Sequence, residues 1–559
     1  MGAKSRKAAY DVVVLGTGIA GLATALAAHE KGLTCLVLEK DAKIGGGTCE
    51  SAGLIWIGDN HLARAAGYQD SRAEVVEYMR FLAGGEAWEQ NFFAFIDRAD
   101  EAAQFFERCG VRFRLIRGLP DHYYGIAAGA HAEGRMIEVE LISGHELDGW
   151  RERVRVPPTL PVYVTMEEAI AWGGWNRAPH WDRDLVRERR AKDMRGQGVG
   201  LICHFLKALL ARGVSPRTGV QVERLAFDGH RVTGVITKAD GEIAAARGVV
   251  IATGGYESNP TMVRDLDGWT NWISQYPPAI AGDGFVLATE IGAAFRRSPN
   301  NMQLFLGYSI PPEKEGEEPR IQQAGIIEMF SPHTMVVNRA GRRFADETYF
   351  QGIVPALRLF DPAIHDYPNV PCYLIFDAQY AAAYSFAGRQ EGAGVPPWVP
   401  QADTVAGLAR RLGIDPDGFG QTVERFNGFV RAGRDDDFQR GGRAWRLARY
   451  LGGDGRNRSL GTIAQPPFYG VELHPCGAGS VGLLTTEWGQ VLHQRRWPIA
   501  GLYAVGNAAA RVEFGAGYQA GLTLASGMTF GYLAAEYLGR TEAAPGAELL
   551  GRSVRARDA

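Results

Sequence analysis

Residues 11–39 read DVVVLGTGIAGLATALAAHEKGLTCLVLE, and they decide the fold class of the chain. An apolar run over 12–15 is followed by a glycine turn, an alanine-rich segment and a second apolar run over 35–38. Short apolar runs fit buried strands, and the longer alanine-rich segment between them fits a helix. The stretch therefore predicts a strand, a turn, a helix and a parallel strand, which together form a βαβ unit.

Three glycines and one acid give this unit the features of a dinucleotide site. Gly16 permits the tight turn, Gly18 lets backbone N–H groups approach a pyrophosphate, and Gly21 lets the helix pack closely on the sheet. Glu39 ends the second strand, where a carboxylate can accept a hydrogen bond from a ribose hydroxyl. An ordinary strand-turn-helix with incidental glycines is the weaker alternative. The cofactor contacts expected in this stretch are Gly16, Gly18, Ile19, Ala20, Gly21 and Glu39.

The composition is that of a large soluble globular protein. The chain has 559 residues, 46% of them hydrophobic, so it is long enough to form two or more cores. Its 60 basic and 63 acidic residues give a net charge of −3, which offers no electrostatic case for a nucleic-acid partner. The six cysteines lie far apart without a Cys-x-x-Cys pair, which fits buried thiols in a reducing compartment and predicts no metal site.

Neither a signal peptide nor a membrane span is expected. Asp11 interrupts the apolar run that follows the basic N-terminus, so residues 1–9 are interpreted as a disordered lead-in to the first strand. No apolar run approaches the roughly 18 residues that a spanning helix needs. We therefore expect a cytoplasmic enzyme. A Trp-, Pro- and Arg-rich segment over 150–181 leaves peripheral membrane contact open.

Glycine-rich segments recur along the chain. Segment 45–53 combines a glycine cluster with hydroxyl side chains, which can face a diphosphate and a planar ring or can form a flexible loop. Apolar runs over 248–252 and 501–505 each end in a glycine turn, and the second leads to an apolar helix whose N-terminus favours negative charge. A Gly-Asp-Gly triplet at 282–284 opens a further helix, either as a cofactor contact or as an ordinary N-cap.

Segment 45–53, placed directly after Glu39, resembles a phosphate and flavin contact of FAD enzymes in the superfamily of fumarate reductases and 3-ketosteroid dehydrogenases. The Ala-Thr-Gly-Gly segment at 252–255 resembles that superfamily's contact near the pyrophosphate. Val222 matches the position whose backbone meets the adenine. The resemblance implies non-covalent FAD rather than NAD, because the contacts extend along a longer cofactor. The further contacts that it implies are Lys40, Gly46, Gly47, Thr48, Ser51, Gly53, Val222, Ala252, Thr253, Gly254, Asp283, Gly506, Asn507, Gly521, Leu522 and Leu524.

The same resemblance implies an α/β fold in which a discontinuous Rossmann-type FAD-binding domain carries an inserted α+β cap domain. Residues 1–293 and 461–543 are expected to form the FAD-binding domain, and 294–460, which hold no nucleotide signal, the cap. Within the first part, residues 120–195 read as an irregular insertion, either a lid or a membrane or subunit contact. The polar end, 544–559, is expected to be a disordered tail.

Dicarboxylate reductases of the superfamily need a cationic pocket, and this chain departs from their pattern at three places. The superfamily pattern of Asn, Gly, Arg-Phe and an acid is present over 338–347, but Tyr349 follows it where the reductases place an arginine. Tyr518 stands in the glycine turn before the last helix, where the reductases again have an arginine. Residues 477–479 are Gly-Ala-Gly in place of histidines. Reduction of a fumarate-type substrate is therefore disfavoured.

The same residues suit a hydrophobic, neutral ketone. Removing hydrogen from a saturated C–C bond beside a carbonyl requires a donor to the carbonyl, a base for the α-proton and flavin N5 to accept the hydride. We expect Tyr518 to serve the carbonyl or proton transfer, with the backbone N–H of Gly521 as a second donor. Tyr349 is expected to be its partner. Tyr124, in a Tyr-Tyr pair, is a weaker candidate.

Residues 517–531 spell Gly-Tyr-x-x-Gly-x-Thr-Leu-x-x-Gly-x-x-Phe-Gly and resemble the 3-ketosteroid dehydrogenases. They are more similar to the Δ4-(5α) branch, because Δ1 enzymes have one more residue between the tyrosine and the helix. Ala520 departs from the serine of the Δ4-(5α) enzymes, so a proton relay through that serine is absent and the substrate or ring position can differ.

Three alternatives stay open at this point. The enzyme can be a Δ1-dehydrogenase, or a reductase of activated alkenes that runs the same chemistry backwards, since both directions use the same residues. A flavin-binding protein without turnover is the alternative from another class. The sequence does not identify the electron acceptor.

Overall fold

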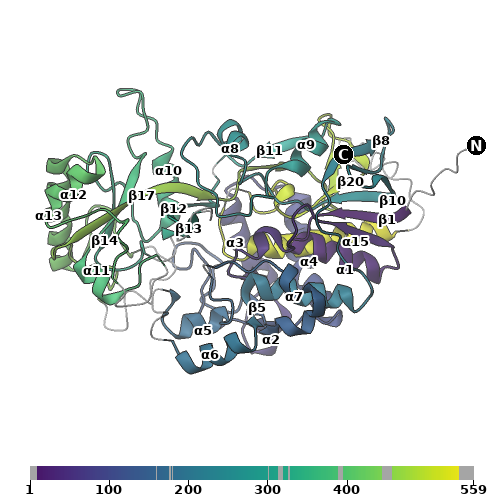
Figure 1. The fold of residues 1–559 in the computed structure, drawn as a ribbon, viewed down its shortest axis with the longest axis horizontal. Helices are drawn as coiled ribbons and strands as arrows, with labels where there is room; N and C mark the ends of the chain where they lie inside the picture. The colour runs from purple at the N-terminus through teal and green to yellow at the C-terminus, as the bar shows by residue number, and fades with distance from the viewer. Residues whose placement is uncertain are drawn as a thin grey trace, which may run out of the picture.

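Two large β-sheets, one toward each end of the molecule, organise the structure (Figure 1). The computed structural model describes residues 9–158, 160–175, 178, 181–299, 301–312, 319–324, 328–387, 394–442, 456–515 and 517–540. The tail predicted over 544–559 lies outside the described residues, as does most of the N-terminal lead-in. No described helix combines the length and the apolar character that crossing a membrane requires.

The first sheet has seven strands and contains the predicted βαβ unit. Its order is β19-β20-β10-β1-β2, with β9 and then β8 attached to β10. β1 pairs in parallel with β2 and with β10, and β10 pairs in parallel with β20. The predicted strands over 12–15 and 35–38 are confirmed. The strands are β1 (Ala9–Leu15), β2 (Cys35–Leu38), β8 (Val222–Phe227), β9 (Val232–Thr237), β10 (Gly241–Ile251), β19 (Gln490–Leu492) and β20 (Pro498–Ala504).

Helices rich in small residues cover one face of this sheet. α1 (Ile19–Glu30) is buried from Ile19 to Ala28 and packs against α15 (Leu522–Gly539) and α7 (Gln197–Leu210). A Cβ atom at Gly531 of α15 would lie 2.9 Å from the carbonyl oxygen of Ala20, so glycine permits this close helix contact. α4 (Glu89–Arg108) packs on α15 and adds the phenylalanines of its buried face, as its amphipathic pattern predicts.

The second sheet forms the cap, which is drawn in green in Figure 1. Its order is β13-β12-β17-β15-β14, with β16 on β17, and all its pairs are antiparallel. β17 (Phe468–Gly477) lies in the middle and beyond residue 460, where the cap was predicted to end. The other strands are β12 (Leu304–Ile310), β13 (Arg320–Gln323), β14 (Thr334–Asn338), β15 (Cys372–Asp377) and β16 (Gln401–Ala402); the helices are α10 (Phe350–Leu357), α11 (Ala378–Ala383), α12 (Val405–Leu412) and α13 (Pro416–Ala432).

The chain passes between the two sheets on a two-stranded ribbon. β11 (Phe295–Arg297) follows α9 (Asp283–Thr289) and pairs in antiparallel fashion with β18 (Val481–Leu483). These residues lie directly before β12 and directly after β17, so the entry to the cap and the exit from it run side by side. α8 (Pro260–Asp267) precedes the ribbon.

The insertion over 120–195 contains short helices, although its composition predicts irregular structure. α5 (Met166–Ala171) begins with a capping box between Thr165 and Glu168, and α6 (Arg183–Ala191) begins at Asp182, whose side chain accepts from backbone N–H groups. The remaining elements before and around it are β3 (Ile55–Trp56), α2 (His61–Ala65), α3 (Arg72–Ala83), β4 (Phe113–Leu115), β5 (Met136–Val139), β6 (Ile142–Ser143), the 3₁₀ segment Gly144–Arg153 and β7 (Met194–Arg195).

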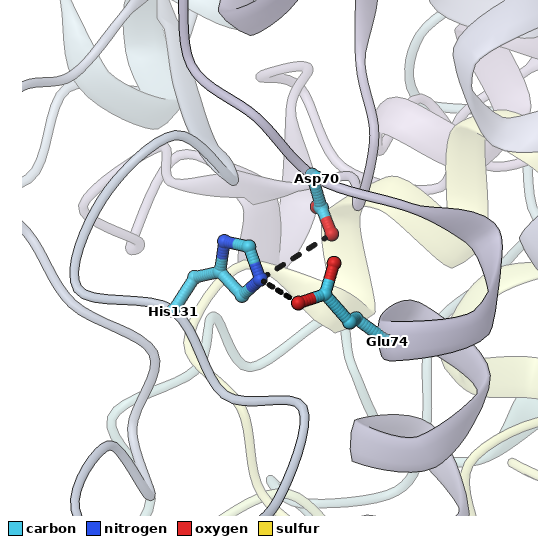
Figure 2. A group of neighbouring side chains, drawn as sticks. All are labelled: Asp70, Glu74 and His131. Atoms are coloured by element: carbon cyan, nitrogen blue, oxygen red, sulfur yellow. Dashed lines mark ion pairs between the residues drawn. The ribbon is translucent and has the colours of Figure 1, made fainter.

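A network of charged side chains holds the start of the insertion on α3. Figure 2 shows His131 beside Asp70 and Glu74, with its Nε2 3.6 Å from the first carboxylate and 3.4 Å from the second. The guanidinium of Arg135 binds Asp70 through two nitrogens at 2.7 Å and reaches Asp121 at 2.8 Å. Because Arg135 already supplies positive charge to Asp70, the cluster is explained as an ion-pair network rather than as a metal site.

A second network of buried ion pairs lies inside the cap. Glu347 is 1% exposed and accepts from Arg343 at 2.6 Å and from Arg440 at 3.1 Å, while Arg343 also contacts Asp435 at 2.8 Å. Although burial raises it, the two guanidinium groups hold the pKa of Glu347 below its usual value. The charges therefore compensate one another inside the cap.

Glu347→Gln is expected to destabilise the enzyme, because it removes the negative charge that compensates Arg440 and Arg343 in a buried place. We expect a loss of roughly 3 kcal/mol in the free energy of unfolding, measured by urea denaturation. Arg425→Ala breaks an exposed ion pair with Asp437 and serves as the control, with little change expected. Equal effects of the two variants would contradict the role assigned to Glu347.

Candidate active site

A cavity of about 940 Å³ is lined by residues of the first sheet, the insertion and the cap. Its wall combines the glycine segments of the first sheet, residues of the insertion and residues of the cap. Three strands bring the glycine segments together: β1 leads into Gly16, β10 into Ala252 and β20 into Gly506. Ligands of open parallel sheets bind at the carboxyl ends of the strands, and the cavity begins there.

The structure gathers nearly all the predicted cofactor contacts on this wall. Gly21 and Leu522 are the two that do not line it. A Cβ atom at Gly21 would lie 2.1 Å from the carbonyl oxygen of Gly16, so this glycine serves helix packing, and Leu522 is fully buried in the core. The predicted contacts on the wall are Gly16, Gly18, Ile19, Ala20, Glu39, Lys40, Gly46, Gly47, Thr48, Ser51, Gly53, Val222, Ala252, Thr253, Gly254, Asp283, Gly506, Asn507, Gly521 and Leu524.

The wall has room and hydrogen-bonding groups for a dinucleotide. A Cβ atom at Gly18, the N-cap of α1, would meet only the Thr48 hydroxyl, at 3.6 Å, so the backbone there is open to a ligand. Thr253 lines the cavity, and its buried Oγ1 has no hydrogen-bond partner among the described residues. The N-terminal ends of α1 and α15 both reach the wall. These features fit the phosphates of FAD.

Two charged groups on the wall have protein partners. Glu39 accepts hydrogen bonds from the backbone N–H groups of Thr17 at 3.1 Å and Asp41 at 2.9 Å, so its carboxylate also holds the turn after β2. Lys40 donates to Asp283 at 2.8 Å. Asp283 is the first residue of α9 rather than its N-cap, which is Gly282. The pair thus joins the end of β2 to the start of α9 beside the cofactor space.

Tyr518 lies on the wall where the first sheet, the insertion and the cap meet. Its ring stands edge-on to His122, with centroids 5.0 Å apart, and to Phe305 of β12, 5.4 Å apart. Hydrogen bonds of two glutamine side chains fix the loop around Tyr518. Gln303 donates to the carbonyl of Gly517 at 3.0 Å, and the buried Gln519 accepts from the backbone N–H of His122 at 2.7 Å. The loop that carries Tyr518 is therefore pinned to both neighbouring parts of the chain.

Gly521 stands three residues further on, at the N-cap of α15 and on the same wall. Its φ is +90°, and a Cβ atom would lie 2.6 Å from the backbone nitrogen of Trp56. Glycine is required here because no other residue both adopts this conformation and leaves that space free. The turn therefore brings the side chain of Tyr518 and the start of α15 to the same end of the cavity.

The other predicted tyrosines are placed differently. Tyr349, the residue before α10, is half-buried and does not line the cavity; its ring lies against that of Tyr123, with centroids 6.0 Å apart. The hydroxyl of the buried Tyr123 is hydrogen-bonded to the side chain of Tyr349 and to the backbone of Tyr518. Tyr124 is 47% exposed and lies outside the cavity. Of the Tyr-Tyr pair, Tyr123 is thus buried beside Tyr349 and Tyr518, and Tyr124 faces the solvent.

Burial raises the pKa of Tyr123 well above its usual value, and the hydrogen bond to Tyr349 adds to that rise. Tyr123 therefore keeps its proton and can donate a hydrogen bond to the hydroxyl oxygen of Tyr349. A donated hydrogen bond stabilises negative charge on the acceptor. This arrangement favours Tyr349 as the tyrosine of the pair that can hold negative charge.

Several residues of the wall carry no sequence signal that would have identified them. The cap contributes residues scattered along its sequence, without a common motif: Gln303, Phe305, Ile321, Gln322, Gln323, Glu328 and Ser385. The insertion contributes a group that includes its Pro and Trp residues, so at least part of that segment covers the cavity. Its members on the wall are Pro158, Leu160, Pro161, Tyr163, Trp175, Ala178, Trp181, Arg183, Val186, Arg187 and Arg190.

Comparison with known proteins identifies the family. Residues 11–524 match the FAD binding domain family. The chain is 34% identical to 4-oxocyclohexanecarboxylate 2-dehydrogenase of Sinomonas cyclohexanicum, over 94% of this chain and 92% of that protein. It is 30% identical to 3-oxosteroid 1-dehydrogenase of Mycolicibacterium smegmatis, over 96% of this chain and 98% of that protein.

A solved structure shares the complete fold. The 3-ketosteroid Δ1-dehydrogenase from Sterolibacterium denitrificans, in complex with 1,4-androstadiene-3,17-dione, superposes with a TM-score of 0.85 at 28% identity, over 96% of this chain and 100% of that one. The predicted α/β fold with an FAD-binding domain is confirmed. The chain belongs to the FAD binding domain family and is an FAD-dependent oxidoreductase related to the 3-oxosteroid 1-dehydrogenases.

Proposed function

We propose that this enzyme introduces a C=C bond beside the carbonyl of a ring ketone of the 3-ketosteroid class. The observation that carries the proposal is Tyr518, a hydroxyl donor on the cavity wall beside the start of α15 and the cap. The relatives whose names specify 3-oxosteroid dehydrogenation match this chain over nearly its full length, which supports the same reaction type here.

Tyr518 and Gly521 supply two hydrogen-bond donors for the carbonyl oxygen of the substrate. As hydrogen leaves the neighbouring carbon, negative charge develops on the carbonyl oxygen, and a hydroxyl and a backbone N–H can both donate to it. The pinned loop keeps the two donors in place before the substrate binds, so little reorganisation is required during the reaction. When bound, FAD supplies the oxidant that accepts the hydride from the β-carbon.

Tyr349 is proposed to take the α-proton, which requires its hydroxyl to reach the end of the cavity beside Tyr518, since the side chain does not line the cavity in this structure. Its oxygen accepts the hydrogen bond of Tyr123, which helps it to bear the negative charge of the deprotonated form. The backbone N–H of Tyr518 is bound to the same Tyr123 hydroxyl, so the donor and the base are connected through one buried residue. Tyr123, absent from the residues first expected to be catalytic, is here a positioning residue.

Two ring positions of the steroid are candidates for the dehydrogenation. The spacing of Tyr518 and Gly521 supports Δ4-(5α) dehydrogenation, which we propose as the reaction. The overall similarity to a Δ1-dehydrogenase, with a TM-score of 0.85, supports the Δ1 position as the alternative.

Anaerobic mixing of the yellow protein with 5α-saturated and with 4-ene 3-ketosteroids tests the proposal, with flavin absorbance as the readout. Bleaching by the saturated compound alone is expected. Bleaching by the 4-ene compound would establish the Δ1 alternative in place of Δ4. No bleaching with either compound would refute steroid ketones as substrates.

Tyr518→Phe is expected to retain FAD and to lose flavin bleaching by roughly 10²- to 10³-fold, because a donor to the developing oxyanion is removed. Rapid-mixing absorbance at saturating substrate measures the rate. Tyr124→Phe is the matched control, since it removes the same atom from an exposed tyrosine outside the cavity. An unchanged bleaching rate in Tyr518→Phe would overturn the assignment.

Tyr123→Phe is expected to shift the pH–rate profile to higher pH. The variant loses the hydrogen bond that stabilises the deprotonated base, so a more alkaline solution is needed to form that base. The rate at high pH should recover most of the wild-type value, whereas the rate near neutrality falls. A profile that is lowered equally at all pH values would show that Tyr123 has only a structural role.

A further inference from the structure

Glu328 is a buried carboxyl group on the cap end of the cavity wall. Its residue is 1% exposed, and one oxygen accepts a hydrogen bond of 2.7 Å from the hydroxyl of Tyr308. The other oxygen, Oε2, is buried and has no hydrogen-bond partner among the described residues. A buried polar group without a partner is costly, so a group that binds in the cavity is the natural partner for this oxygen.

The position of Glu328 suits the far end of a long substrate. Phe305 contacts Tyr518, and Tyr308, which holds Glu328, follows three residues later on β12. Three residues of a strand span roughly 10 Å, and because side chains alternate, Phe305 faces the cavity while Tyr308 points into the cap core on the other face of β12. The offset along the strand is about the length of a four-ring ketone, measured from its reactive carbonyl to the opposite end.

Glu328 is also held in a rigid environment. The ring of Tyr308 stacks on Phe386, with centroids 5.2 Å apart and an interplanar angle of 4°. Ser385, which precedes Phe386, lines the cavity. Its backbone carbonyl accepts a hydrogen bond of 3.1 Å from the hydroxyl of the buried Tyr380. Because the surrounding rings are tightly packed, the carboxyl group has little freedom to move. It can therefore discriminate between ligands by the position of their polar atom.

We propose that Glu328, oriented by Tyr308, donates a hydrogen bond to a second oxygen at the end of the substrate opposite the reactive ketone, and so selects substrates that carry an acceptor there. The proposal rests on the proposed function and specifies its substrate class. A neutral ketone or hydroxyl oxygen can accept this bond, and a purely hydrocarbon end cannot.

The protonation of Glu328 agrees with a donor role. Burial raises its pKa to about 8, although the hydrogen bond from Tyr308 and the backbone N–H of Ala387, which lies nearby but outside hydrogen-bond geometry, oppose the rise. The titratable groups near it are Tyr308 and, beyond Tyr308, Tyr380. Arg440, whose guanidinium donates to the carbonyl of Met329, the residue next to Glu328, is also engaged with Glu347 and with other backbone carbonyls. Below about pH 8 Glu328 is therefore a neutral acid that can donate.

Two substrates and two variants test the inference in the flavin-loaded enzyme. The substrates are 5α-androstane-3,17-dione, which has an oxygen at each end, and 5α-androstan-3-one, which lacks the second oxygen. Wild-type enzyme is expected to show a KM for the dione roughly three- to tenfold lower, the value of one hydrogen bond, with similar kcat. In Glu328→Leu the two KM values should converge.

Glu328→Gln provides a second measurement that does not depend on the folding of the leucine variant. An amide still donates but does not titrate, so the dione should keep its low KM, and the rise of KM above about pH 8 seen in wild-type enzyme should disappear. Glu472→Gln, on the exposed side of β17, is the control and should behave as wild type.

Each outcome decides the question. If Glu328→Leu still prefers the dione as wild type does, or if the pH dependence of KM persists in Glu328→Gln, the proposal is overturned. If wild-type enzyme bleaches with both steroids but does not distinguish them, the proposed function stands and the role of Glu328 fails. If neither steroid bleaches or perturbs the flavin spectrum, both fail.

Discussion

The site depends on the parallel pairing of three strands that come from distant parts of the chain. β1, β10 and β20 end at Leu15, Ile251 and Ala504, and backbone hydrogen bonds continue past these ends: Ala252 donates to Leu15 at 2.8 Å and Val505 to Ile251 at 3.0 Å. The three following turns therefore leave the sheet at the same level and form one wall. A shift of one residue in either pairing would move a turn by roughly 3.3 Å and break up that wall.

The parallel pairing of these strands also positions Tyr518. β20 delivers the chain to α15, and the loop before α15 is tied by Gln519 to the insertion and by Gln303 to the cap. Tyr518 therefore takes its position from three parts of the structure at once, although it sits on a loop. The ribbon of β11 and β18 joins the cap to the first sheet beside this loop, which explains how residues hundreds of positions apart meet at one end of the cavity.

Patterns with a local physical cause could be read from the sequence, and features set by tertiary contacts could not. The βαβ unit and its glycines were predictable, because strand hydrophobicity and turn geometry are local. β17 was assigned outside the cap, because nothing in its sequence shows that it pairs with β12 and β15. In the pair Tyr123 and Tyr124, a turn decides which ring is buried, and the sequence gives no means to choose. The sequence does not distinguish Glu328 from other acidic residues, because its role depends on the tertiary contact with Tyr308.

The electrostatics of the cap support the proposal of a neutral ketone rather than a dicarboxylate as substrate. Two anions require unpaired cations, yet the buried guanidinium groups of the cap are compensated internally: Arg343 by Glu347 and Asp435, and Arg440 by Glu347. The described cap residues of the wall offer glutamine and serine groups and one carboxyl whose pKa burial raises to about 8, whereas the arginines of the wall, Arg183, Arg187 and Arg190, belong to the insertion. An anion bound against these cap residues would meet no compensating charge from them and would lose its hydration. A ketone oxygen loses far less, and hydroxyl, N–H and carboxylic acid donors are sufficient to bind it.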